Sequence, residues 1–92
     1  MTLAVVWDAD ARSDLQEITQ YIADRNAAAA TRIGQAVQHA ADRLPDHPYM
    51  HRPGRVPGTR EAIVHPNYIL VYRVGTDVID ILAILHARQQ YP

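Results

Sequence analysis

Residues 68–87 read YILVYRV, GTD and VIDILAILHA, and this stretch decides the fold. Both apolar runs are rich in Val, Ile and Tyr, which favour strands, and the segment between them is short and carries glycine and aspartate. A connection this short joins antiparallel neighbours. A third such run precedes them across only Pro66 and Asn67. The C-terminal third therefore predicts an antiparallel meander with strands at 59–65, 68–74 and 78–87.

Two amphipathic helices are predicted upstream of the meander. The first covers about residues 9–24, and the second follows an N-cap at Asn26 and stops at Pro45. Apolar residues recur on both at intervals of three and four, which places them on one stripe of each helix: Leu15, Ile18 and Ile22, then Ile33, Val37 and Leu44. The short joint between the helices predicts an antiparallel hairpin. A β-prone run, residues 3–7, precedes the first helix.

This order predicts an α+β protein, β-α-α-β-β-β, with a helical hairpin packed on one face of a small antiparallel sheet. A length of 92 residues, 48% of them hydrophobic, suits one domain spanning 1–92. The alternation along the last strand predicts two faces. Ile79, Ile81, Ala83 and Leu85 are expected to face the helices, and His86 and Arg88 to share the opposite face.

This chain lacks the residues that several kinds of site require. Cysteine is absent, so there is no disulfide, no thiolate zinc site and no cysteine nucleophile. No phosphate-binding loop, dinucleotide fingerprint or zinc-protease motif occurs, and we expect neither a cofactor nor a metal. The apolar run Leu3–Trp7 is short and is followed by acidic residues, which fits neither a signal peptide nor a membrane span. We expect a cytoplasmic protein with no membrane partner.

The basic residues are all arginine, and they outnumber the acidic residues only in the second half of the chain. Residues 1–50 hold four Arg against seven acids, whereas residues 51–92 hold five Arg against three acids. The second half is therefore the better face for an anionic partner. Arg60 and Arg73 fall on neighbouring predicted strands and could converge on a phosphate or a carboxylate. The alternative is a solvated strand face or an ion pair with Glu61, Asp77 or Asp80.

Among the histidines, His86 has the strongest case for a function, since it ends an apolar strand and Arg88 follows two residues later. A structural role at the strand end is the alternative. We expect His65 to support the adjacent turn, and His47 and His51 to be solvated loop residues. Tyr68 and Tyr72 alternate with aliphatic residues, so packing is their expected role.

Several segments, in order along almost the whole chain, resemble the RelE/ParE toxins of bacterial type II toxin-antitoxin operons. They read WD (7–8), AR (11–12), DL (14–15), YI (21–22), RPGRVPGTRE (52–61), YILVYRV (68–74) and ILAILHARQ (81–89). The resemblance implies the fold predicted above and a cognate antitoxin whose extended, partly helical segment wraps the toxin. Operator DNA would then be contacted only through the antitoxin. Because one helical layer leaves apolar surface uncovered, we expect that antitoxin to bury at least roughly 1,200 Å² in total.

The family divides by target, and the resemblance leaves three functions open. ParE-like members inhibit DNA gyrase, RelE-like members cleave messenger RNA on the ribosome, and a decayed relative could only bind its antitoxin and co-repress the operon. RNA-cleaving members carry an arginine where this chain has Ile69, and they are more basic. The hypothesis of gyrase inhibition is therefore favoured, and it requires no enzymatic activity of the toxin. The expected target-binding residues are Arg60, Arg73, His86 and Arg88; in an RNase, the catalytic set would be His86, Arg88, Arg60 and Tyr91.

Overall fold

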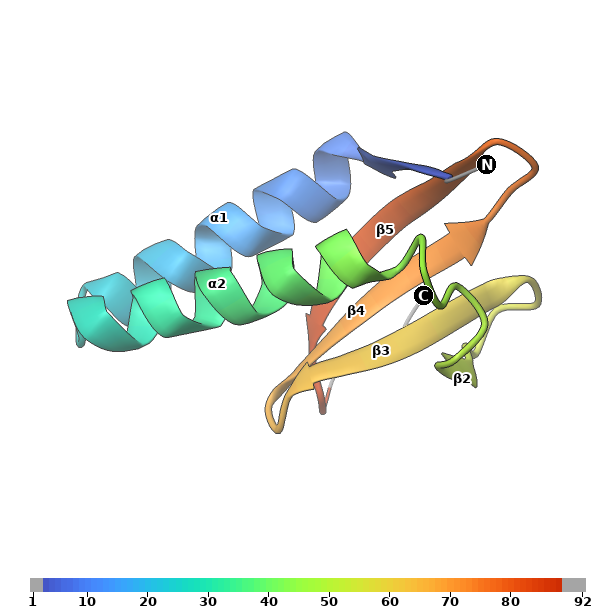
Figure 1. The fold of residues 1–92 in the computed structure, drawn as a ribbon. Coiled ribbons are helices and arrows are strands. Elements are labelled where there is room, and N and C mark those ends of the chain that lie inside the picture. The colour runs from blue at the N-terminus through green and yellow to red at the C-terminus, as the bar shows by residue number, and fades with distance from the viewer. Residues whose placement is uncertain (1–2, 89–92) are drawn as a thin grey trace.

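The computed structural model describes residues 3–88, which form a helical hairpin over one face of a sheet (Figure 1). The elements are β1 (Ala4–Trp7), α1 (Ala9–Ala23), α2 (Ala27–Arg43), β2 (Arg52–Pro53), β3 (Thr59–His65), β4 (Tyr68–Val74) and β5 (Val78–His86). The predicted α+β class is confirmed, and both helices and the three meander strands lie within a residue or two of the predicted positions.

The strand order in the described part of the sheet is β1-β5-β4-β3-β2. The meander is confirmed, because β3 pairs antiparallel with β4 and β4 pairs antiparallel with β5. The sheet as a whole is mixed, since β1 runs parallel to β5 with Val5 opposite Ile79. A parallel pair requires a long connection, and here it runs through both helices and strands β2, β3 and β4. Strand β2 was not predicted; it pairs with β3 at the outer edge of the sheet.

The core lies between the hairpin and the sheet. Asn26 caps α2 as predicted, its side chain accepting a hydrogen bond from the Ala29 N–H at 3.0 Å. The buried cluster takes one stripe from each layer: Ala11, Ile33, Val37, Ala41 and Leu44 from the hairpin, and Ala62, Leu70, Tyr72, Ile79, Ile81 and Ile84 from the sheet. The stripe of α1 formed by Leu15, Ile18 and Ile22 is only half-buried.

A β-bulge in β5 changes which residues face the helices. Tyr72 pairs with Ile81, but the preceding Val71 pairs with Ala83, so Leu82 is an extra residue with no partner on β4. Past the bulge the alternation is inverted, and Ile84 joins the core cluster. The predicted helix-facing set was therefore wrong for Ala83 and Leu85, because one inserted residue exchanges the two faces of everything beyond it.

The same bulge corrects the placement of His86. Register pairs His86 with Tyr68, which packs against the core on the helix side of the sheet. His86 therefore lies on the helix side, and its predicted position on the opposite face was wrong. Arg88 lies in the turn that follows the last residue of β5, where it is exposed.

Candidate functional site

His86 lines a groove at the end of β5, which we call the strand-end groove. Its walls come from α1, β4 and β5: Glu17, Ile18, Tyr21, Tyr68 and His86. The amphipathic pattern of α1 places Glu17 and Tyr21 one turn apart on the flank beside the core stripe. The groove therefore combines a carboxylate, two phenols and an imidazole, which are groups able to donate or accept protons.

Ring contacts hold the imidazole of His86 in this groove. The rings of Tyr68 and His86 meet edge to face with centroids 5.6 Å apart. The centroid of the His65 ring lies 5.8 Å from that of Tyr68. His86 Nδ1 accepts a hydrogen bond from the Arg88 N–H at 3.2 Å. His65 Nδ1 similarly accepts from the Asn67 N–H at 3.1 Å, which confirms its predicted role in the turn.

The turn after β5 is attached to the turn between β3 and β4. The Ala87 N–H donates to the Asn67 carbonyl at 2.7 Å. This bond sets the backbone from which the exposed Arg88 side chain projects, close in sequence to His86. Tyr91, the tyrosine expected in a catalytic set, lies outside the described residues.

Arg60 belongs to a second cluster at the other end of β4, which we call the loop end and which comprises Tyr49, His51, Arg60 and Tyr72. Its Nη1 donates to the His51 carbonyl at 2.7 Å and to the Tyr49 carbonyl at 3.2 Å. The guanidinium also lies over the Tyr49 ring, 4.9 Å from its centroid. The cation expected to bind a target thus fixes the backbone of the loop between α2 and β3.

Burial governs the titration of the loop end. Tyr72 is fully buried, and its hydroxyl donates to the Pro48 carbonyl at 2.7 Å. Burial raises the pKa of the Tyr72 phenol above its usual value, and nearby Arg60 opposes that shift. The pKa of His51 is lowered, chiefly by desolvation and also by the positive charge of Arg43. Both groups are therefore neutral at pH 7, and His51 is half-buried rather than solvated as the sequence predicted.

Arg73 lies on the opposite face of the sheet from Arg60. Register pairs Arg60 with Tyr72 on the helix side, whereas Arg73 pairs with Thr59 and Asp80. The two guanidiniums cannot converge on one anion, so that expectation was wrong. On that face Asp80 lies opposite Arg73, and the Glu61 carboxylate forms an ion pair with Arg52 at 3.0 Å across β2 and β3.

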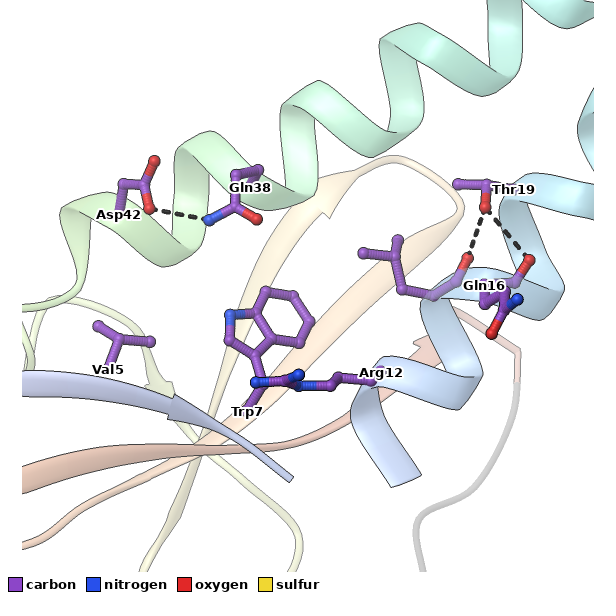
Figure 2. A pocket seen from close by; sticks show the side chains of 8 residues that line it. Val5, Trp7, Arg12, Gln16, Thr19, Gln38 and Asp42 are labelled. Carbon is purple, nitrogen blue, oxygen red and sulfur yellow. Dashed lines mark hydrogen bonds between the residues drawn. The ribbon is translucent and has the colours of Figure 1, made fainter. Parts of the chain in front are cut away.

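Another groove opens between the two helices and β1 (Figure 2). It measures about 690 Å³ and has an apolar floor of Val5, Trp7 and Leu15. Polar side chains from both helices form its rim: Arg12, Gln16, Thr19, Gln38 and Asp42. Gln38 donates to Asp42 at 2.9 Å, and the Thr19 hydroxyl donates back to the Leu15 carbonyl at 2.9 Å. We call it the helix groove.

Comparison with known proteins decides the family. The sequence model described as "ParE toxin of type II toxin-antitoxin system, parDE" matches residues 5–91. The chain belongs to the ParE toxin family. A protein of Sinorhizobium fredii is 39% identical over 87 residues, covering 94% of this chain and 90% of its own length. Toxin RelE2 of Caulobacter vibrioides is 35% identical over 83 residues, covering 90% and 93%.

Solved structures of related toxins share the fold of this ParE-family chain. A structure of the chromosomal ParDE system of Pseudomonas aeruginosa matches with a TM-score of 0.83 at 22% identity, covering 92% of this chain and 96% of the other. The RelBE2 toxin-antitoxin complex of Mycobacterium tuberculosis matches with a TM-score of 0.70 at 26% identity, covering 94% and 99%. This chain is therefore a type II toxin of the ParE/RelE family.

Sequence reasoning selected the strand end of this ParE-family toxin and missed two other features. The helix groove combines residues far apart in the chain, and only the spacing of four between Gln38 and Asp42 marked a shared helix face. Glu17 was not selected, although its position one turn before Tyr21 indicated a common flank. Among residues 3–88 no group of three or more acidic or histidine side chains is placed to hold a metal ion, and no helix there is long and apolar enough to span a membrane.

Proposed function

We propose that this ParE-family toxin arrests growth by binding DNA gyrase in the cytoplasm, and that a cognate antitoxin neutralises it. The observation that carries the proposal is the lining of the strand-end groove, which includes no arginine. Cleavage of RNA through the ribose 2′-hydroxyl builds negative charge on the phosphate, and cationic donors must stabilise it. Arg60 is bonded to loop carbonyls, and Arg73 lies on the other face of the sheet.

Two other cations lie near the groove: Arg25, whose guanidinium lies 3.9 Å from the centroid of the Tyr21 ring, and Arg88, which is exposed in the turn after β5. An exposed guanidinium beside a pair of aromatic rings suits recognition of an acidic protein surface. It can donate two hydrogen bonds to one carboxylate, and such binding requires no catalytic centre. Ile69 supports the same proposal, since the family resemblance places an arginine there in RNA-cleaving members. His86 and Arg88 then act as binding residues, with Arg73 a separate contact on the far face.

The helix groove is the surface that best suits an antitoxin. Its apolar floor and polar rim fit one face of an amphipathic segment, and Arg12 and Asp42 on opposite helices could each meet a charge of opposite sign. Toxin-antitoxin complexes among the similar structures support a partner of this kind. A stable complex would bury more than this groove, so exposed side chains around it are expected to contribute.

Induced expression in bacteria tests the proposal. We expect growth arrest accompanied by a DNA-damage response, and purified toxin should inhibit supercoiling by gyrase. Rapid loss of translation with cut messages, and no effect on gyrase, would contradict it. No arrest at all would favour a protein that only binds its antitoxin and co-represses the operon.

The second candidate function is ribosome-dependent cleavage of messenger RNA. One observation favours it: Glu17, Tyr68 and His86 line the same groove and could supply an acid and a base. In that case Glu17→Gln and His86→Ala should abolish site-specific cuts in ribosome-bound message, with Arg88 supplying the cation. Unchanged messages in cells arrested by the wild-type toxin would exclude this activity.

A further inference from the structure

Arg25 lies where the helical hairpin turns, and its side chain completes the last turn of α1. The three backbone amides that follow the helix, residues 24–26, donate to the carbonyls of Gln20 and Ile22 over 2.7 to 3.1 Å. These bonds pass over the Tyr21 carbonyl, which accepts instead from Arg25 Nη1 at 3.0 Å. Carbonyls at the end of a helix lack partners within the helix, so a side-chain donor of this kind satisfies one of them. The bond folds the arginine side chain back along α1.

The folded-back guanidinium covers one face of the Tyr21 ring. The Arg25 Cζ atom lies 3.9 Å from the ring centroid, where the aromatic face attracts a cation. The Tyr21 side chain is nevertheless 61% exposed, and it lines the strand-end groove together with Tyr68 and His86. Arg25 therefore brings a fixed positive charge to the α1 wall of this groove.

Arg88 brings a second positive charge to the β5 wall. Its backbone N–H bonds to His86 Nδ1 at 3.2 Å, and the residue is exposed. Figure 1 shows the joint between α1 and α2 projecting beyond the sheet, and Arg25, within that joint, is exposed as well. Each arginine thus contacts a residue that lines the groove, one from the helix side and one from the strand side.

The charges of the groove favour a protein segment over a nucleic acid as the ligand. Glu17 also lines the groove. A nucleic acid carries a negative charge at every nucleotide, so a strand that followed the groove would meet this carboxylate. A peptide can instead place single carboxylates against the two arginines and an uncharged side chain against the rings. Tyrosine and arginine are also the residue types that most often dominate the binding energy of protein interfaces.

We propose that Arg25 and Arg88 bind one acidic segment of the target protein from the two sides of the strand-end groove. The aromatic rings of the groove then contact an uncharged side chain of that segment. The inference rests on the proposed function and adds to it the chemistry of the segment that the toxin recognises. The bond between Arg25 and the Tyr21 carbonyl holds the guanidinium in place before the target binds, which reduces the entropy lost on binding.

Two substitutions of Arg25 separate target binding from helix capping. Arg25→Gln keeps a side-chain N–H donor and removes the charge, whereas Arg25→Lys keeps the charge. The full-length variants are compared in growth inhibition and in affinity for purified DNA gyrase, with Arg32→Gln, at an exposed arginine of α2, as the matched control. We expect Arg25→Gln to weaken gyrase binding by at least about tenfold and to relieve growth arrest. Arg25→Lys should lose less affinity, and Arg32→Gln should match the wild type.

The outcomes distinguish this inference from the proposed function. A folded Arg25→Gln protein that binds gyrase and arrests growth like the wild type would overturn the inference, and a simultaneous loss of both by Arg88→Ala would leave the proposed function intact. Growth arrest by a wild-type toxin that does not bind gyrase would contradict the proposed function instead. In that case, binding to message-programmed ribosomes that Arg25→Gln weakens would overturn the acidic segment as the ligand. Relief of arrest by Arg25→Gln with unchanged ribosome binding would support a protein ligand.

Discussion

The two ends of β4 hold similar residues for different purposes. Each end has a tyrosine that meets a histidine ring edge-on: Tyr72 with His51 at 6.1 Å, and Tyr68 with His86 at 5.6 Å. At the loop end the tyrosine is fully buried, and both its hydroxyl and the neighbouring Arg60 bond to loop carbonyls. At the strand end the tyrosine is half-buried and opens onto a groove. The surrounding backbone, rather than residue type, decides which cluster supports the fold and which opens onto a groove.

The largest effect on stability is expected where the loop end enters the core. Tyr72→Ala should lower the free energy of unfolding by about 3–5 kcal/mol, because it leaves a cavity and an unpaired Pro48 carbonyl. Tyr68→Ala, the matched change at the strand end, should cost less than half as much because Tyr68 is only half-buried. Urea unfolding of the two variants measures the difference. Equal losses would mean that both ends are core.

Arginine substitutions sharpen the same comparison. Arg60→Ala removes two bonds to carbonyls and should lower the free energy of unfolding by about 1.5–3 kcal/mol. Arg73→Ala, on the far face with its side chain exposed, should stay within about 0.5 kcal/mol of wild type. Thermal unfolding at matched pH is sufficient to rank them. A tolerated Arg60→Ala would return Arg60 to the list of target-binding residues.

These two ends also show what the sequence could predict. Helix and strand positions followed from periodicity, and the turn role of His65 followed from its place beside Pro66 and Asn67. The face of His86 could not be predicted, because the all-apolar segment 81–85 hides the bulge at Leu82. The structural role of Arg60 was equally hidden, since its partners are backbone carbonyls in a loop, which leave no side-chain signature.

The smallest predicted effect concerns pH and the loop end. Because burial and Arg43 lower the pKa of His51 in the folded protein, the unfolded chain binds a proton more readily. The contribution of neutral His51 is therefore fully present above the ordinary histidine pKa of about 6.5 and is lost as the pH falls below it. His51→Gln should flatten the fall in unfolding free energy between about pH 7.5 and pH 5. An unchanged pH profile would show that His51 is not desolvated.

The central claim is that toxicity comes from the strand end and stability from the loop end. Growth inhibition by Arg88→Ala, at expression equal to wild type, tests it most directly, with His47→Ala as the matched control in the exposed loop. We expect Arg88→Ala to lose toxicity and more than tenfold of its affinity for the target, since a charge-assisted contact contributes about 1.5–3 kcal/mol. It should still fold and bind the antitoxin, and His47→Ala should remain toxic. A fully toxic Arg88→Ala would contradict the account and direct the search to the loop between Arg52 and Arg55.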